Sequence, residues 1–233
     1  MEHTMPTLKA YAVLEKYEMT GDIYFAEKSI YAAIWGANEY AEGDLGGVQC
    51  RRAPWADQYA ETGVPAKVAV EYGWRFECVG CGITVDSDLP YDHRLPVNGI
   101  CGKVSGAVYC SPRCKWKKMR HDLRRKAQEK SAIEDFKRIV ADRFPDVEFV
   151  EDTEALRGHH AYVTEGERGG WHRGQVIVAF NFPGMKIGPA HFRMDQFHKI
   201  GPPEAGYTCC NGDADAFKAY AAQHPVDSGE NDR

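Results

Sequence analysis

The sequence predicts an α+β fold in which a cysteine-containing central module with a long basic helix lies between a small α/β segment and a β-rich segment. Two close pairs of cysteines occupy the middle of the chain, and a long amphipathic helix is predicted to begin at the second pair. Beyond that helix, short apolar runs alternate with glycine-rich turns, a pattern typical of strands. We therefore divide the chain into residues 1–72, 73–145, 146–224 and a polar tail at 225–233.

The first segment reads as strands and helices in alternation. Residues 8–17 and 23–26 have strand character, and Ser29 is placed to cap a helix with Ile30, Ala33, Ile34, Ala37 and Tyr40 on one face. The glycines of residues 42–47 end that helix, and Pro54 begins a second, short one. Residues 64–78 are expected to form a strand-like run that leads directly into Cys78.

The long helix has clear start and stop signals. Ser111 is placed as its N-cap, Pro112 occupies its first position, and Pro145 ends it. Apolar residues recur at steps of three and four, so one face should be apolar: Trp116, Met119, Leu123, Ala127, Ile133, Phe136, Val140 and Phe144. Strands are predicted within residues 147–150, 159–164, 175–180 and 185–194, followed by a short helix at 213–223.

The composition is that of a folded intracellular protein. Hydrophobic residues make up 43% of the chain and charged residues 27%, an ordinary globular balance. The N-terminus has no basic and apolar signal pattern, and no apolar stretch is long enough for a membrane span. We expect a cytoplasmic protein without a membrane partner, in which eight cysteines are more consistent with metal binding or redox chemistry than with disulfides.

Four of the cysteines have the spacing of metal ligands. Cys78 and Cys81 are separated by two residues and followed by a glycine, which lets a chelating turn close. Cys110 and Cys114 lie at the predicted start of the long helix, where the helix dipole favours thiolates. Four thiolates form a closed tetrahedral site, so we predict structural zinc, with redox thiols or buried free cysteines as the alternative.

The second half of this pattern, Tyr109-Cys110-Ser111-Pro112-Arg113-Cys114, resembles treble-clef zinc fingers whose second half reads Phe/Tyr-Cys-Ser-x-x-Cys. Examples are the eukaryotic MYM-type fingers, TRASH-type modules and the small bacterial zinc protein that inhibits gyrase. The interval between the two cysteine pairs is longer here than in the gyrase inhibitor. The resemblance implies a treble-clef-like module that binds protein or nucleic acid.

Three stretches resemble uncharacterised proteins of tailed phages and prophages. They are residues 21–40, 50–60 and 64–82. This resemblance implies a phage-encoded protein, which would work in the host cytoplasm, and it supplies no mechanism. An inhibitor that docks on a host protein is a separate interpretation.

Basic charge is concentrated at the start of the long helix. The window from Arg113 to Lys130 holds nine lysines and arginines and two acids, a formal charge of +7 in a chain whose net charge is −5. We interpret this helix as a surface for phosphates of DNA or RNA, or for an acidic host protein. A solvated charged face is the alternative. The candidate contact residues are Arg113, Lys117, Arg120, Arg124 and Arg125, with Trp116 available to stack on a base.

A nuclease is the competing interpretation. Asp92-His93-Arg94-Leu95-Pro96 lies between the cysteine pairs and is similar to the Asp-His-x-x-Pro signature of HNH endonucleases, in which the histidine acts as a general base. The residue after the last cysteine is Lys115 where that family has asparagine or histidine, and His121 is the replacement we consider. A loop histidine with no catalytic role is the simpler account of His93.

The remaining histidines and cysteines have no metal-binding spacing. Cys209 and Cys210 are adjacent, and no C-terminal histidine pair has helical spacing with a carboxylate. The sequence therefore predicts a zinc-stabilised binding or regulatory protein that acts on nucleic acid or on a host nucleic-acid or defence complex. It leaves the oligomeric state and the identity of the partner open.

Overall fold

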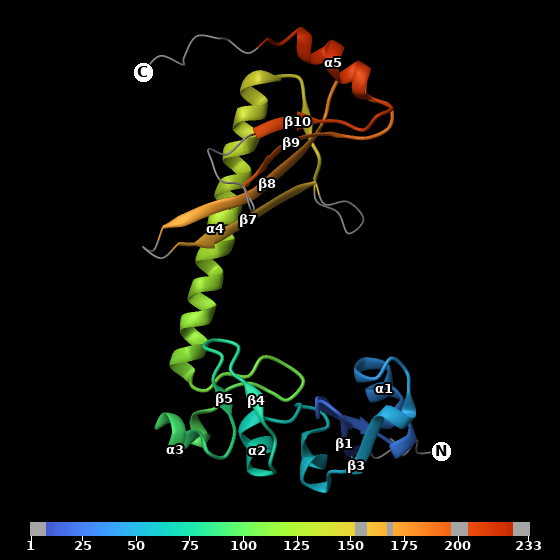
Figure 1. Cartoon of the computed structure of the whole chain (residues 1–233), viewed down its shortest axis with the longest axis vertical. Coiled ribbons are helices and arrows are strands. Elements are labelled where there is room, and N and C mark those ends of the chain that lie inside the picture. Colours follow the sequence, from blue (N-terminus) through green and yellow to red (C-terminus); the bar gives the residue numbers. More distant parts are fainter. Residues whose placement is uncertain (1–7, 152–157, 167–169, 197–204, 226–233) are drawn as a thin grey trace, which may run out of the picture. The chain divides into compact units, whose positions relative to one another are not determined.

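The computed structural model describes residues 8–151, 158–166, 170–196 and 205–225 as helices and antiparallel sheets (Figure 1). This confirms the predicted α+β class. The chain forms two compact units, Met1–Arg120 and His121–Arg233, so the boundary falls inside the long helix. The predicted segment boundaries near residues 72 and 145 stay predictions.

The first unit begins with a three-stranded antiparallel sheet. Its central strand β1 (Lys9–Glu15) pairs with β2 (Gly21–Ala26) on one side and with β3 (Val48–Arg52) on the other. Helix α1 (Ser29–Tyr40) packs on this sheet, as the blue part of Figure 1 shows. Strands β1 and β2 and helix α1 arise where the apolar patterns predict them, and β3 was not predicted.

The predicted apolar face of α1 coincides with its buried face only at Ala37. The residues that the helix buries are Ala32, Gly36 and Ala37, whereas Ile30 and Ile34 are exposed. Ser29 is the first helical residue instead of its cap, since Lys28 precedes the helix and no side chain caps it. The sheet surface admits only small side chains, and this close packing overrides the hydrophobic periodicity.

The strand expected at residues 64–78 is wrong over most of its length. Residues 66–71 form α2 (Ala66–Glu71), and only Phe76–Glu77 remain as strand β4. Pro65 precedes this helix and Gly73, at a φ of 84°, follows it, so the short apolar run is bounded by helix start and stop signals. The short helix predicted at Pro54 is confirmed as the 3-10 helix η2 (Pro54–Tyr59); a second one, η1 (Leu45–Gly47), precedes β3.

The rest of the first unit is assembled from very short elements. Strand β4 pairs with β5 (Thr84–Val85), and α3 (Leu89–His93) and η3 (Val97–Gly99) follow. Their buried side chains, with two of the cysteines, form a small core: Ala66, Val70, Cys78, Val85, Leu89, Ile100, Val108 and Cys110. The cysteine pairs therefore belong to this core and are not appended to it.

The long helix α4 (Pro112–Arg143) has the predicted limits. The backbone N–H of Cys114 donates to the Ser111 hydroxyl at 3.2 Å, which confirms Ser111 as the cap. The predicted apolar stripe is buried only in its second half, at Phe136, Val140 and Phe144, and the unpredicted Ala132 is buried beside it. In its first half, the apolar side chains Trp116, Met119 and Leu123 are exposed.

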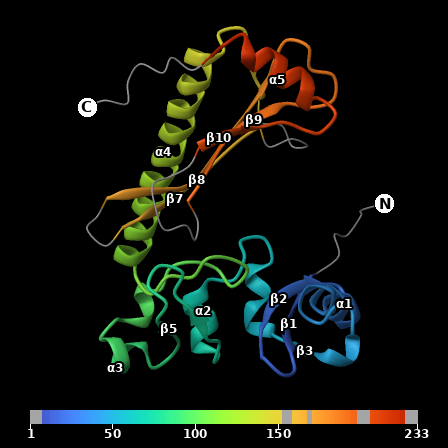
Figure 2. The ribbon, with the colours of Figure 1, turned by 45° about the horizontal axis from the view of Figure 1, so that its top comes forward.

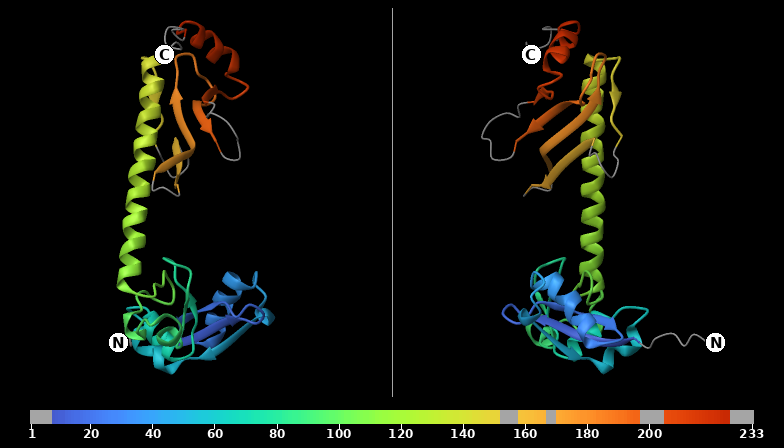
Figure 3. Two further views of the ribbon diagram at one scale, coloured as in Figure 1. Left: turned by 60° about the vertical axis from the view of Figure 1, so that its left-hand side comes forward. Right: turned by 90° about the vertical axis from the view of Figure 1, so that its right-hand side faces the viewer.

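The second unit is an antiparallel sheet backed by helices. Its strands are β6 (Glu148–Phe149), β7 (His159–Glu165), β8 (Trp171–Asn181), β9 (Ala190–Asp195) and β10 (Ala205–Thr208). The order is β10-β9-β8-β6, and β7 also pairs with β8. The second half of α4 runs along one face of this sheet (Figure 2), and α5 (Ala214–Ala222) lies near the end of that half, as the red helix in Figure 3 shows.

Aromatic side chains fill the space between this sheet and its helices. Phe144 is fully buried, and its ring lies 6.0 Å from that of Phe180 on β8 and 5.4 Å from that of Tyr220 on α5. Phe136 meets Phe192 at 5.1 Å. The core of the second unit is thus one continuous aromatic cluster and contains no ligand of the cysteine site.

Candidate metal centre

Cys78 and Cys81 are positioned by the turn between β4 and β5. The backbone N–H of Cys78 donates to the carbonyl of Ile83 at 2.9 Å, and that of Gly82 donates to the carbonyl of Cys78 at 2.8 Å. Gly82 has a φ of 74°, which a glycine adopts without strain. These bonds close the turn tightly and direct both sulfurs to the same side, as the spacing predicts.

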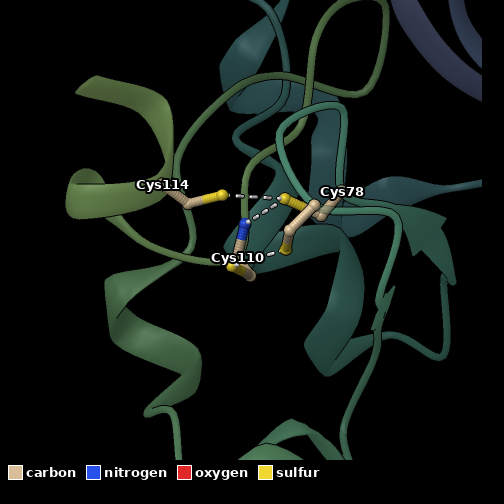
Figure 4. Close-up of side chains that lie close together, drawn as sticks. Cys78, Cys110 and Cys114 are labelled. Atoms are coloured by element: carbon tan, nitrogen blue, oxygen red, sulfur yellow. Dashed lines mark hydrogen bonds between the residues drawn. The ribbon is translucent and has the colours of Figure 1, made fainter. Parts of the chain in front are cut away.

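Cys110 and Cys114 are positioned by the start of α4. An isolated bridge joins Cys101 and Tyr109 immediately before the cysteines and fixes the approach of the chain. Ser111 then caps the helix, and Cys114 lies in its first turn. A hydrogen bond joins the two cysteine pairs: the backbone N–H of Cys110 donates to the Cys78 sulfur at 3.3 Å (Figure 4).

The four sulfurs form a cluster of the size that zinc requires. All four lie within 4.8 Å of one another. The Cys78 and Cys114 Sγ atoms are 3.6 Å apart, and the Cys81 and Cys110 Sγ atoms are 3.7 Å apart. With Zn–S bonds of about 2.3 Å, the edges of a tetrahedron of sulfurs measure about 3.8 Å. The donor set and its spacing therefore fit a tetrahedral four-thiolate metal site.

The electrostatics of the cluster also favour a cation. Burial opposes ionisation of Cys78, but backbone N–H groups, first that of Cys110, outweigh it and lower the pKa to about 7. Burial raises the pKa of Cys110 to about 11, and the neighbouring thiols add to the effect. Burial and the neighbouring thiols likewise raise the pKa of Cys114. One thiolate forms readily, and ionising the others beside it requires compensating positive charge, which a divalent metal ion supplies.

The four cysteines differ in their exposure to solvent. Cys78 and Cys110 are buried and Cys114 is partly buried, whereas Cys81 is exposed at the edge of the cluster. Four protein ligands fill a tetrahedral shell and leave no position for a substrate. The arrangement can therefore stabilise the fold around it, and it offers no vacant coordination position for catalysis.

One residue at this site was not anticipated from the sequence. Gly80, between the first two cysteines, lies directly against the Cys114 sulfur. The glycine that the spacing predicts to close the turn is Gly82, which follows Cys81. Because Gly80 and Cys114 are far apart in the sequence, no local sequence pattern predicts their contact.

The basic residues of α4 are at the surface. Arg113, Lys117, Arg120 and Arg124 are exposed, and their spacing of four, three and four places them on one face of the helix. Arg125 is half-buried and pairs with Glu129 at 3.1 Å, so it does not belong to that free face. Within the described parts of the chain, no carboxylate pairs with any of the four exposed residues.

Exposed apolar side chains lie beside this basic face. Trp116, Met119 and Leu123 are 59%, 51% and 67% exposed, and their spacing of three and four forms an adjacent stripe. The Arg120 guanidinium lies over the Trp116 ring, 4.7 Å from its centroid. The first half of α4 therefore presents cations and an aromatic ring together.

The candidate nuclease residues are distributed over both units. Asp92 and His93 are exposed on α3. His121 belongs to the other unit, where its Nε2 lies 3.2 Å from a Glu165 carboxylate oxygen and its Nδ1 lies 3.7 Å from Asp122. Among the described residues, the four cysteines are the only cluster of three or more histidines, cysteines or acids with metal-ligand geometry.

The other cysteines, and the histidines of the second unit, lie outside the metal cluster. The Cys210 thiol donates to the Asp213 carboxylate at 3.7 Å, and Cys50 and Cys101 are half-buried. His160 and His191 line a hollow of about 400 Å³ on the sheet of the second unit. Among the described residues that line it, the guanidinium is that of Arg193, which pairs with Asp195 at 2.8 Å.

No protein-family model, curated protein or solved structure matches this chain. In the part of the chain that the structure describes, no helix has both the length and the apolar character that crossing a bilayer requires. The function must therefore be argued from the cysteine cluster and the surface of α4.

Proposed function

We propose that this protein binds nucleic acid through the first half of α4, and that a zinc ion held by Cys78, Cys81, Cys110 and Cys114 anchors the start of that helix. One observation carries the proposal: Arg113, Lys117, Arg120 and Arg124 are exposed on one helix face beside an exposed tryptophan. Cations on one face follow a phosphate backbone, and an aromatic ring stacks on unpaired bases.

Zinc has a mechanical role in this proposal. The cluster holds Cys114 in the first turn of α4 against the turn of Cys78 and Cys81. The start of the basic helix is thereby fixed to the small core of the first unit. The treble-clef-like fingers that the cysteine pattern resembles present binding helices in a similar way, and a phage-encoded regulator of a host complex is consistent with this role.

The exposed apolar side chains on the first half of α4 favour a binding surface over a charged face that only contacts solvent. A solvated face needs no exposed tryptophan, methionine and leucine beside it, since such side chains are normally covered. Arg120 stacked over Trp116 further resembles the cation–aromatic surfaces that single strands contact. We therefore favour single-stranded DNA or RNA as the ligand, with an acidic host protein as the alternative occupant.

A matched pair of double variants tests this proposal. Lys117→Gln with Arg124→Gln removes two cations from α4, whereas Lys67→Gln with Arg51→Gln removes the same residue types from exposed positions elsewhere. Fluorescence anisotropy with labelled single strands should show weaker binding and a salt dependence reduced by about 1.4 in log–log slope for the α4 variant only. Equal effects of both variants would mean that attraction is non-specific, and the proposal would fail.

Cleavage is tested separately. We expect binding without hydrolysis when the protein is incubated with DNA and Mg²⁺ or Mn²⁺. Cleavage that disappears in His93→Ala would establish the HNH-like nuclease alternative instead. Recovery of a stable acidic host protein, with no affinity for nucleic acid, would favour the partner-inhibitor interpretation.

A further inference from the structure

A hollow of about 790 Å³ lies in the first unit, on the face of the three-stranded sheet that α1 does not cover. On that face, Ala10 and Ile23 are buried beneath η2 and α2. Ala12 and Leu14, on the same side of β1, line the hollow instead. The covering elements therefore leave this end of the sheet open, and the volume lies within the range of about 300–1,000 Å³ that small-molecule sites have.

Aromatic side chains line much of the hollow: Tyr40, Tyr72, Trp74 and Phe76. The Tyr72 ring is 55% exposed and stacks on the Trp55 ring, with the two centroids 4.2 Å apart. The Trp74 and Phe76 rings also stack, at 6.3 Å. These ring contacts hold the aromatic surface in place without a ligand, and the faces of such rings attract cations.

The charged residues that line the hollow are Glu18, Glu77 and Arg75. The Arg75 Nε atom lies 3.3 Å from an Asp86 carboxylate oxygen, so Asp86 balances its charge. Within the described parts of the chain, no cation forms an ion pair with Glu18 or Glu77, and both glutamates are exposed. The two glutamates therefore give the hollow an excess of negative charge.

Two lysines lie close in sequence to residues of the hollow, and each has its contact outside it. Lys16 donates its ammonium group to the Gly46 carbonyl. The Lys103 side chain passes beside Gly63. Neither glycine lines the hollow. The excess of negative charge favours a cationic ligand over an anionic one.

We propose that this hollow binds an organic cation, that is, an ammonium or guanidinium group carried on an apolar body. The apolar body would contact Ala12, Leu14 and the aromatic rings, and the positive charge would face Glu18 and Glu77. A free amine and a basic side chain of a peptide share this chemistry. The proposal is independent of nucleic-acid binding by α4, because no residue of α4 lines the hollow.

Two cations and their uncharged isosteres test the selection for charge. Choline is compared with 3,3-dimethylbutanol, and glycyl-arginyl-glycine with its citrulline analogue, by calorimetric titration of the full-length, zinc-loaded chain. At least one cation should bind about tenfold more tightly than its isostere. Tighter binding of choline would indicate a small molecule as the natural ligand, and tighter binding of the peptide would indicate a protein side chain. If neither cation binds better than its isostere, the proposal is wrong.

Removal of the negative charge tests the assigned carboxylates. Glu18→Gln and Glu77→Gln should each weaken binding of the cation about two- to fivefold, the effect of one exposed charge pair. Glu61→Gln is the matched control, since Glu61 is exposed and lies outside the hollow, and it should bind like the wild type. Glu77 adjoins Cys78, so the zinc content of its variant is measured as well; Glu18 is distant from the cysteines in sequence.

Removal of an exposed ring tests the aromatic contribution. Tyr72→Ala should weaken binding about two- to fivefold, and Tyr72→Phe, which keeps the ring, should retain most of the affinity. Tyr91→Ala is the control, because Tyr91 is 90% exposed in the same unit and does not line the hollow. Circular dichroism confirms that each variant is folded. Folded Glu18, Glu77 and Tyr72 variants that all bind like the wild type, or controls that weaken binding equally, would overturn the proposal.

Discussion

A Cβ atom on Gly80 would lie 2.5 Å from the Sγ atom of Cys114. That distance is far shorter than a van der Waals contact, so no larger residue fits between the two cysteine pairs without moving a sulfur. Gly80 is therefore a requirement of the metal centre, although it donates no ligand.

Gly80→Ala should weaken zinc binding by about 10- to 100-fold, the usual effect of disturbing the surroundings of a metal ligand. Competition with a zinc-binding dye measures the change. Gly99→Ala in the same unit is the control, because a Cβ there meets only Pro96 at an ordinary 3.6 Å. Unchanged affinity in Gly80→Ala would show that the cluster tolerates displacement of Cys114.

Cys110→Ser should abolish stoichiometric zinc binding, since serine at this position leaves three thiolates and disrupts the tetrahedral shell. Elemental analysis should find one zinc ion per wild-type chain and little in the variant. Cys50→Ser is the control: the Cys50 thiol donates only to the Ser29 carbonyl, at 3.4 Å, and a hydroxyl can replace it. Equal zinc contents in the two variants would refute the assigned ligand set.

Trp116→Ala should weaken binding to single strands by about 1–3 kcal/mol, the contribution of one stacked base. The Trp116→Ala substitution removes no cation, so the salt dependence of binding should stay unchanged. The loss of Lys117 and Arg124 should instead reduce it. Trp116→Phe preserves a stacking ring and should retain most of the affinity. Anisotropy titrations at several salt concentrations separate the two effects, and an affinity unaffected by Trp116→Ala would exclude stacking.

Asp213 should make the second unit sensitive to acid. Its buried carboxylate accepts the backbone N–H groups of Ile187, Gly188 and Lys186, at 2.7–3.1 Å, and these bonds, with that of Ile187 first, lower its pKa. A lowered folded-state pKa contributes stability above the unfolded value near 4, and that stability is lost as the pH falls through the folded value.

Asp213→Asn should lower the melting temperature at neutral pH by several degrees and flatten its decline below about pH 4. Thermal unfolding followed by circular dichroism across this pH range measures both effects. Asp215→Asn, two residues away at an exposed position, is the matched control and should behave like the wild type. A variant as acid-sensitive as the wild type would assign the effect to other carboxylates.

The sequence predicted features with strong local signals. The spacing of Cys78, Cys81, Cys110 and Cys114 predicted that they lie together, and the structure confirms this clustering; the identity of the metal stays a prediction. Ser111 and Pro112 predicted the start of α4 because capping is a local interaction. Both predictions rest on contacts within a few residues or on unusual ligand chemistry.

The features that the sequence missed depend on distant contacts. The inner face of α1 is decided by how closely Gly36 approaches Val13, which no periodicity reveals. Residues 66–71 form a helix although their apolar run also fits a strand, an ambiguity that short segments leave open. The amphipathic pattern of α4 continues through Trp116 and Leu123, but the core that covers it begins only near Ala132.

The separation of the four cysteines from the aromatic core has a thermodynamic consequence. With zinc as the assigned ligand, the folded first unit binds it and the unfolded chain releases it, so each tenfold rise in free zinc above the dissociation constant adds about 1.4 kcal/mol to the stability of that unit. The second unit holds Phe144, Phe180 and their neighbours without any cysteine of the cluster. The stability of the first unit would then depend on the concentration of free zinc, whereas no thiolate of the cluster contributes to the core of the second unit.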